Sequence, residues 1–303
     1  KPDQAAMTFQ GTEFTWAQWR DRILCIAAAL AESGIGAGDT VAFVDKNHLS
    51  CLEVTYAASL LGAANVVPNW RLSSEELDYV LADCGARILF VGSELLPQVV
   101  AMRDRLTAVE SIFAVGGEHD EFEPWIDEVT PLHARPEVSP DATALVLYSS
   151  GTTGRPKGVQ LTHRNLFAHS NNVLEILPAH EDHRFLIAMP MFHVGGLCIQ
   201  TLPALAVGAK VSLQPRFEPG AWFDAVESWK PTTTLLVPAV MRALIEHPRW
   251  ATADLSSLAI ADPLGLWAAI AAGVIVGLLV YAWARRGDNA RFFPVWVGGI
   301  TTA

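Results

Sequence analysis

The sequence has few cysteines and no clustered basic residues, and each shortage excludes a class of protein. Its four cysteines (Cys25, Cys51, Cys84 and Cys198) are far apart and form no Cys-x-x-Cys pair. This spacing argues against zinc knuckles and a disulfide framework, and it is typical of reduced, cytoplasmic thiols. Lys and Arg together number 21 against 32 Asp and Glu, which gives a formal charge of −11. Because a nucleic-acid phosphate surface needs clustered Lys and Arg, we expect no nucleic-acid partner.

Two catalytic signatures are also missing. The chain has no Gly-x-Ser-x-Gly elbow and no His-Glu-x-x-His pair, which argues against a hydrolase of the elbow type and against a zinc protease. No internal repeat or low-complexity tract is present. The chain opens on Lys1-Pro2-Asp3 without a Met or a signal-peptide pattern, so we expect that its natural start lies upstream.

The most informative stretch that is present covers residues 148–159 and follows an apolar, strand-like run at 143–147. Its glycines let the backbone approach an anion closely, and successive N–H groups in such a loop form a concave nest for phosphate oxygens. A lysine adds a mobile charge, and the hydroxyls can donate to oxygens or bind a hard cation. The stretch therefore predicts a polyphosphate site, with these members: Ser149, Ser150, Gly151, Thr152, Thr153, Gly154, Lys157 and Gly158.

This stretch differs from a Walker A loop. Lys157 has the right offset from Gly151, but Pro156 stands where the second glycine belongs, and Gly158 replaces the Ser or Thr that would hold Mg²⁺. The alternative is a polar, glycine-rich turn between two strands, which is the usual interpretation of four or five such residues. The length of the whole string favours the phosphate site.

The string Tyr-Ser-Ser-Gly-Thr-Thr-Gly-Arg-Pro-Lys-Gly-Val at 148–159 resembles the phosphate-loop signature of the AMP-forming adenylating superfamily. That group includes acyl-CoA synthetases, luciferases and the adenylation domains of peptide synthetases. The resemblance implies ATP, Mg²⁺ and CoA as cofactor or co-substrates and a small-molecule carboxylate as substrate. It also implies that Ser149 helps to hold Mg²⁺, while the β- and γ-phosphates are bound by Ser150, Gly151, Thr152, Thr153, Gly154 and Lys157.

A second string, Met-Pro-Met-Phe-His-Val-Gly-Gly-Leu at 189–197, resembles the next motif of that superfamily. The resemblance implies that Phe192 and His193 line the acyl pocket and that His193 is the catalytic residue that controls entry of the thiol. A lone His in an apolar run is more often a buried core residue. We favour the functional interpretation, because the two motifs follow each other in the family's order and two glycines follow the His.

The remaining pattern predicts an α/β fold of parallel βαβ units, because short apolar strands alternate with amphipathic helices. Two stretches, 14–19 and 61–72, resemble the family's earlier motifs, and the resemblance covers residues 8–258. We expect the acidic passage 116–128 and the proline-rich 131–141 to be a surface connector, with Asp120, Glu121 and Glu123 facing solvent. The predicted helices are 16–30, 49–61, 73–84, 97–106, 163–177, 221–229 and 238–245, and the predicted strands are 41–44, 64–67, 87–91, 111–115, 143–147, 159–161 and 232–237.

Beyond residue 258 the resemblance ends, so we divide the chain into a partial adenylate-forming domain, 1–258, and an unrelated hydrophobic tail, 259–303. Residues 263–284 carry no charge and include a Gly-x-x-x-Gly pair, which predicts a transmembrane helix as against a buried core helix. Arg285, Arg286 and Arg291 follow that run, and the positive-inside rule would then turn residues 1–258 away from cytoplasmic ATP. A foreign join after about residue 258 is the simpler interpretation, and both stay open.

The sequence thus predicts ATP-dependent activation of a carboxylic acid to acyl-AMP and transfer to CoA, most like a fatty-acyl-CoA synthetase of fatty acid metabolism. The family's later motifs (an adenine-binding turn, a Mg²⁺-binding glutamate, a ribose-binding aspartate and a lysine-bearing mobile domain) do not occur in these residues, so we expect an incomplete version of the enzyme. Two alternatives stay open: a membrane-attached, catalytically inactive nucleotide or acyl binder, and a non-functional fragment. We expect a cytoplasmic location, with membrane association through 263–284 as the variant.

Overall fold

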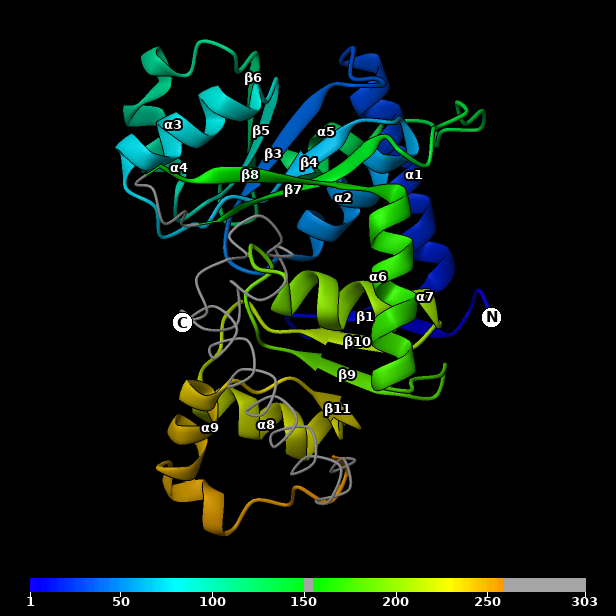
Figure 1. Ribbon diagram of the computed structural model, residues 1–303, viewed down its shortest axis with the longest axis vertical. Coiled ribbons are helices and arrows are strands. Elements are labelled where there is room, and N and C mark those ends of the chain that lie inside the picture. The colour runs from blue at the N-terminus through cyan, green and yellow to red at the C-terminus, as the bar shows by residue number, and fades with distance from the viewer. Residues whose placement is uncertain (150–154, 259–303) are drawn as a thin grey trace, which may run out of the picture. The chain divides into compact units, whose positions relative to one another are not determined.

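Two β-sheets with helices packed against them make up the part of the chain that the computed structural model describes, residues 1–149 and 155–258 (Figure 1). By their contacts, Lys1–Leu258 group as one unit. Two parts of the chain lie outside the described residues: the expected loop residues 150–154, and 259–303 with the hydrophobic run 263–284. Within the described ranges, none of the helices is long and apolar enough to cross a bilayer.

The larger sheet has six strands in the order β6-β5-β3-β4-β7-β8. All its neighbours pair in parallel except β8, which pairs antiparallel with β7. The parallel order confirms the predicted α/β class for this region. Its strands are β3 (Thr40–Val44), β4 (Ala64–Val66), β5 (Ile88–Gly92), β6 (Ser111–Val115), β7 (Thr143–Ser149) and β8 (Lys157–Thr162).

The smaller sheet has the order β11-β9-β10-β1-β2 and is parallel except for the hairpin of β1 with β2. Sequence patterning predicted only β11 in this sheet, and as a longer strand, since the other four strands are short and weakly patterned. The strands are β1 (Ala5–Phe9), β2 (Thr12–Thr15), β9 (Arg184–Ile187), β10 (Lys210–Leu213) and β11 (Thr233–Thr234).

The longer predicted helices are present within a few residues of their expected bounds. The predicted cap at Ser73 is confirmed. Its hydroxyl accepts from the Glu76 backbone N–H, and the Glu76 carboxylate accepts from the Ser73 backbone N–H. The α-helices are α1 (Trp16–Glu32), α2 (Leu49–Leu60), α3 (Ser74–Cys84), α4 (Leu96–Ala101), α5 (Phe122–Asp127), α6 (His163–Ile176), α7 (Leu202–Ala206), α8 (Pro219–Trp229) and α9 (Pro238–Ile245). Shorter turns are the 3₁₀ segments Arg103–Arg105 and Pro248–Ala251 and a π-helix, Gly195–Thr201.

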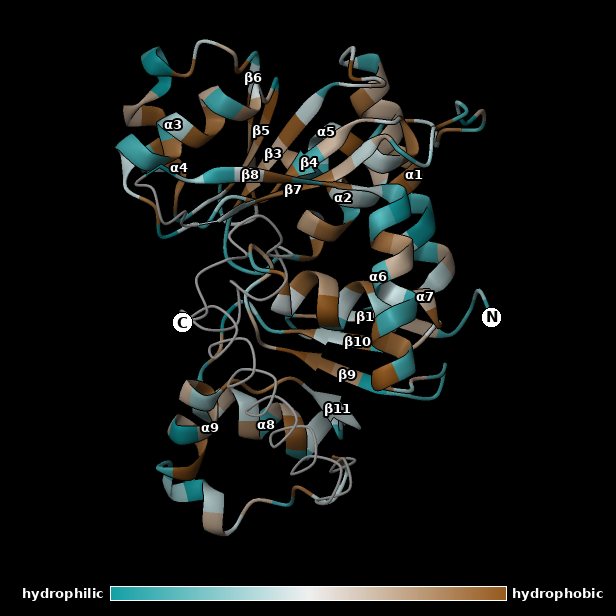
Figure 2. Ribbon diagram, in the orientation of Figure 1, coloured by the Kyte–Doolittle hydropathy of each residue, from teal (hydrophilic) through white to brown (hydrophobic). Residues whose placement is uncertain are grey.

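Alternate residues of β3 face two separate cores, because helices cover both faces of the larger sheet. Phe43 packs in the core that includes Leu52 of α2, and Val44 packs with Leu77 and Leu81 of α3. Strands buried on both faces are continuous apolar runs, as β3 and β5 are. Figure 2 shows this as strands that are largely hydrophobic, beside helices such as α3 and α6 that carry residues of both kinds.

The prediction of a solvent-facing connector at 116–128 is wrong for its second half. Residues 122–127 form α5, whose Phe122 and Ile126 are buried. The three acidic residues have structural partners: Asp120 accepts from the Phe122 N–H, Glu121 accepts from the Ala114 N–H, and Glu123 pairs with Arg22 of α1. The segment packs against the core because burial of its aromatic side chains stabilises that position more than its acidic residues favour solvent.

Candidate functional site

The residues predicted to carry the chemistry follow the carboxyl ends of parallel strands. In open α/β sheets, ligands bind at this edge, where loops from neighbouring strands converge. Ser149 ends β7, and the loop with Trp70 and Arg71 follows its parallel neighbour β4. In the smaller sheet, Phe192 and His193 follow β9 in the same sense. Ser149, Phe192 and His193 therefore lie at the edges where a ligand site is expected.

The predicted phosphate stretch includes the adjoining ends of β7 and β8, the two antiparallel strands of the phosphate hairpin, and its central residues 150–154 are not among those described. β7 leads into it and β8 leaves it, with Ser149 paired to Lys157 and Tyr148 paired to Gly158. A Walker A loop instead leads from a strand into a helix. The structure thus agrees with the difference from Walker A that the sequence indicated.

Ser149 and Lys157 present a hydroxyl and an ammonium group from facing positions on the two strands. Partners across an antiparallel pair project to the same face, opposite to that of the next pair, Tyr148 and Gly158. Both residues are exposed. Among the described residues no acidic side chain pairs with Lys157, so its charge is available to an anion.

Helix α3 contacts the described ends of both hairpin strands. The Tyr148 hydroxyl donates to Asp83 Oδ2 at 2.6 Å, and the Arg155 guanidinium lies 5.3 Å from the ring centre of Tyr79. Burial raises the pKa of Tyr148, and its hydrogen bond to Asp83 raises it further. Gly158 leaves room for this ring: a Cβ there would lie 3.0 Å from Tyr148 Cζ.

Phe192 and His193 lie in the loop between β9 and the π-helix Gly195–Thr201. His193 is exposed and Phe192 is half-buried, so the alternative of a buried core histidine is wrong. His193 Nδ1 accepts from the Gly195 N–H at 3.1 Å, which leaves Nε2 to carry the proton of the neutral ring. π-Helical turns are frequent at functional sites.

Sequence reasoning missed the residue that holds this loop in place, Asn47. It follows β3 and is buried, and its Nδ2 donates to the carbonyls of Met189 and Gln214, both at 3.0 Å. Its Oδ1 accepts from the Met191 N–H at 2.8 Å. The only available signal was its place in a polar string, Asp-Lys-Asn-His, directly after a buried strand.

Arg71 is a second residue to which the sequence pattern assigns no role. Its guanidinium lies 4.8 Å from the ring of Trp70 and 5.9 Å from the ring of Phe192. The segment between β4 and α3 therefore contacts the loop of Phe192 at one end, and through α3 it contacts the phosphate hairpin at the other. The structure links the two predicted groups through this segment.

The described residues do not by themselves fit a resident divalent cation. No group of three or more His, Cys, Asp or Glu side chains within residues 1–149 and 155–258 could hold a metal ion. The Ser149 hydroxyl is a single exposed ligand. Mg²⁺ keeps several waters and is usually bound by one or two carboxylates together with substrate phosphates. A Mg²⁺ ion at this site would therefore need further ligands, such as the phosphate oxygens of a bound molecule.

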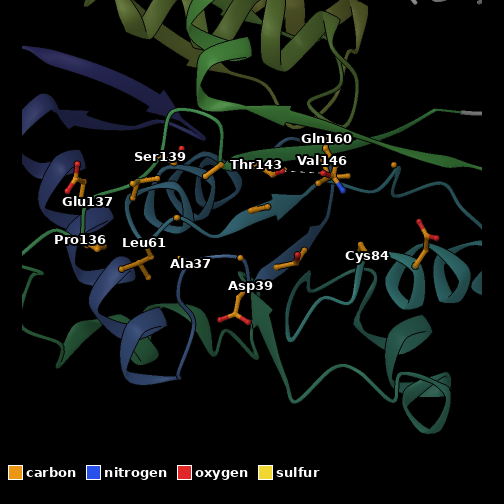
Figure 3. A pocket seen from close by; sticks show the side chains of 18 of the residues that line it. Ala37, Asp39, Leu61, Cys84, Pro136, Glu137, Ser139, Thr143, Val146 and Gln160 are labelled. Atoms are coloured by element: carbon orange, nitrogen blue, oxygen red, sulfur yellow. Dashed lines mark hydrogen bonds between the residues drawn. The ribbon is translucent and has the colours of Figure 1, made fainter.

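A cleft of about 560 Å³ lies on the other face of the hairpin (Figure 3). Tyr148 and Gly158 line it, and Thr143 Oγ1 and Gln160 Oε1 lie 3.3 Å apart within it. None of Ser149, Lys157, Phe192 and His193 lines it. The cleft is therefore separate from these four residues, although both use the same two strands.

Comparison with known proteins finds a matching family and several relatives. The family model described as AMP-binding enzyme matches residues 1–286. The chain is 37% identical to an indoleacetate–CoA ligase of Aromatoleum aromaticum over 261 residues, covering 85% of this chain and 51% of the relative. It is 39% identical to a feruloyl-CoA synthase of an Amycolatopsis species over 257 residues, covering 85% of this chain and 50% of the relative.

A solved structure of the anthranilate CoA ligase AuaEII with anthranoyl-AMP is also similar, with a TM-score of 0.80 and 25% identity. The match covers 85% of this chain and 50% of that one. The chain thus spans about half the length of the relatives that it matches. The family match extends to residue 286, beyond the boundary at 258 that the motifs predicted.

Proposed function

The chain belongs to the AMP-binding enzyme family, and from this premise we propose that it forms the phosphate-binding part of an ATP-dependent acid–thiol ligase. In the proposed reaction, a carboxylate oxygen attacks the α-phosphorus of ATP, and pyrophosphate leaves. The sulfur of CoA then attacks the carbonyl carbon of the acyl-AMP, and AMP leaves as the thioester forms. Such chemistry depends on charge stabilisation at the phosphates more than on a protein nucleophile.

The observation that carries this proposal is the exposed Lys157, which has no acidic partner in the described part of the chain and lies opposite Ser149 at the carboxyl edge of a parallel sheet. We assign Lys157 to the β- and γ-phosphates, where its ammonium can donate to oxygens as charge accumulates. Ser149 is assigned to the phosphate oxygens and the Mg²⁺ that they carry. By resemblance alone, Ser150, Gly151, Thr152, Thr153 and Gly154 join the same phosphate site.

His193 and Phe192 are assigned to the acyl pocket. The exposure of His193 and the fixed orientation of its ring support a position at the pocket entrance. With Nδ1 accepting from Gly195, the ring can donate from Nε2 to a polar atom of the incoming acid or thiol. His193 would then be a catalytic residue that contacts the reacting groups.

We propose two classes of carboxylic acid as the substrate. The motifs resemble fatty-acyl-CoA synthetases, which favours a fatty acid. The names of the two relatives indicate indoleacetate and ferulate, which are aromatic acids. Assays should therefore include a medium-chain fatty acid and an aryl acid side by side.

A second candidate function rests on the uncharged run 263–284: a membrane-attached binder of nucleotide or acyl groups without turnover. In this alternative, residues 1–258 act as a binding domain and 259–303 as its anchor. The ligase proposal implies a cytoplasmic location instead. Fractionation of cells that express the chain, with and without residues 259–303, separates the two candidates.

The test of the phosphate assignment is calorimetric titration of MgATP into the 303-residue chain. Replacing Lys157 by Ala removes one charge-assisted contact, worth about 1.5–3 kcal/mol, so affinity should fall roughly ten- to a hundred-fold. His193→Ala is the matched control, because its assigned place is the acyl pocket and MgATP affinity should be nearly unchanged. If the effects are reversed between the two variants, the phosphate assignment is wrong.

A further inference from the structure

Two side chains of α3 contact residues on the two sides of the predicted phosphate loop, one on β7 and one just before β8. Tyr79 and Asp83 are four residues apart, so they lie on the same face of the helix. Asp83 accepts the hydrogen bond of Tyr148, the residue before the end of β7. Tyr79 lies beneath the guanidinium of Arg155, which comes two residues before β8 begins.

Helix α3 is itself firmly held, which makes it a suitable support. Its first turn is closed by a reciprocal cap between Ser73 and Glu76, and its inner face buries Leu77, Val80 and Leu81. The three residues are at most 3% exposed. The helix ends at Gly85 in the left-handed conformation, which is a common end for an α-helix. Because its inner face is packed in the core, α3 can contact the hairpin through its outer face and keep its own position.

The hairpin side is shaped to receive these contacts. Gly158, the cross-strand partner of Tyr148, leaves space that any larger residue would fill: a Cβ would lie 3.0–3.2 Å from the ring, the hydroxyl and Val146. The Tyr148 ring can therefore lie across the strand pair and reach Asp83. A hydrogen bond from a hydroxyl to a carboxylate is short and charge-assisted, so it fixes position well.

We propose that Tyr79 and Asp83 are positioning residues of the nucleotide site, which hold β7 and β8 so that Ser149 and Lys157 are presented together to the triphosphate. The inference rests on the proposed function. Neither residue is expected to touch the nucleotide. Both act through the hairpin strands, since Tyr148 precedes Ser149 and Arg155 lies two residues before Lys157.

A positioning role and a purely structural role predict different results. Asp83 is exposed and its bond is at the surface, so its loss should change the free energy of unfolding little. If the bond orients the hairpin, its loss should weaken triphosphate binding instead. The decisive quantity is therefore MgATP affinity at unchanged stability.

The experiment titrates MgATP and, separately, Mg-tripolyphosphate into the 303-residue chain carrying Tyr148→Phe, Asp83→Ala, both together, or Tyr79→Leu. We expect each single variant to weaken both ligands about three- to ten-fold with little change in the urea midpoint. The double variant should be no weaker than the worse single variant, because both remove the same bond. Asp78→Ala is the matched control and should bind as wild type, because Asp78 is on the same helix and makes no side-chain hydrogen bond or ion pair with the described residues.

Lys157→Ala is measured in parallel so that the two proposals can fail separately. If Lys157→Ala weakens binding but the α3 and Tyr148 variants do not, the positioning role is overturned and the proposed function stands. If those variants lose affinity only in proportion to a lowered unfolding midpoint, the role is structural and the inference is overturned. If wild type binds no MgATP, or Lys157→Ala binds as wild type, the proposed function fails and the inference fails with it.

Discussion

At the scale of single residues, the loop of His193 depends on a glycine with no room for a side chain. A Cβ on Gly196 would lie 2.4 Å from the carbonyl oxygens of both Met189 and Pro190. These are backbone atoms, so the loop would have to move to accept it. The neighbouring Gly195 is less constrained, since its nearest atom, His193 Nδ1, would lie at 3.5 Å, an ordinary contact distance.

We expect Gly196→Ala to lower the free energy of unfolding by about 1–3 kcal/mol, as overpacking of a close-packed site does. Gly195→Ala should change it by less than about 1 kcal/mol, because its Cβ fits and the backbone need not move. Urea denaturation followed by tryptophan fluorescence measures both variants. Equal losses for the two variants would contradict the steric argument.

At the scale of elements, Arg22 of α1 connects three helices. Its guanidinium donates to Glu53 of α2 at 2.7 Å and to Glu123 of α5 at 2.7 Å. Glu53 is fully buried, and burial raises the pKa of its carboxyl while the Arg22 bonds oppose that rise. Arg22 therefore stabilises the charged form of a carboxylate that has lost its water.

Arg22→Ala should destabilise the fold by about 3–5 kcal/mol, since it leaves the Glu53 charge buried without its partner. The deficit should shrink at low pH, because protonation of Glu53 removes the buried charge, and grow as pH rises above the raised pKa. Arg20→Ala is the control on the same helix: its pair with Asp21 is exposed and is worth about 0–1 kcal/mol. A deficit that does not change between acidic and neutral pH would refute the buried-charge explanation.

The elements that sequence could predict are those with local signals. Helix α3 has its capping box in the sequence, and β3 and β5 have continuous apolar runs. Strands β1 and β10, of five and four residues, carry no such pattern. They pair with each other across the chain, and each also pairs with a second strand, β1 with β2 and β10 with β9. The same limit applies to the site. The bonds of Asp83 with Tyr148 and of Asn47 with Met191 join residues 65 and 144 positions apart, and no local pattern reports them.

At the scale of the molecule, Asn47 ties the larger sheet to the loop of the smaller one. It follows β3 of the six-stranded sheet, and its three side-chain bonds go to Met189, Met191 and Gln214, which follow β9 and β10. Its own N–H donates to the Pro215 carbonyl at 2.9 Å. The carboxyl edges of the two sheets, and so the two predicted parts of the site, are linked at this residue.

Asn47→Ala should therefore cost about 2–4 kcal/mol, because it leaves buried backbone donors and acceptors unpaired. Asn47→Asp should cost nearly as much, since a carboxylate can accept from the Met191 N–H but cannot donate to the Met189 and Gln214 carbonyls.

Asn69→Ala is the control: it removes one surface bond to the Arg71 N–H and should cost less than about 1 kcal/mol. Urea denaturation measures the change in the free energy of unfolding, and hydrogen exchange shows which strands are destabilised. In Asn47→Ala, amides of β9 and β10 should lose more protection than those of β3 and β5. If Asn47→Ala is as stable as wild type, or if protection falls equally in both sheets, Asn47 does not link them as the contacts indicate.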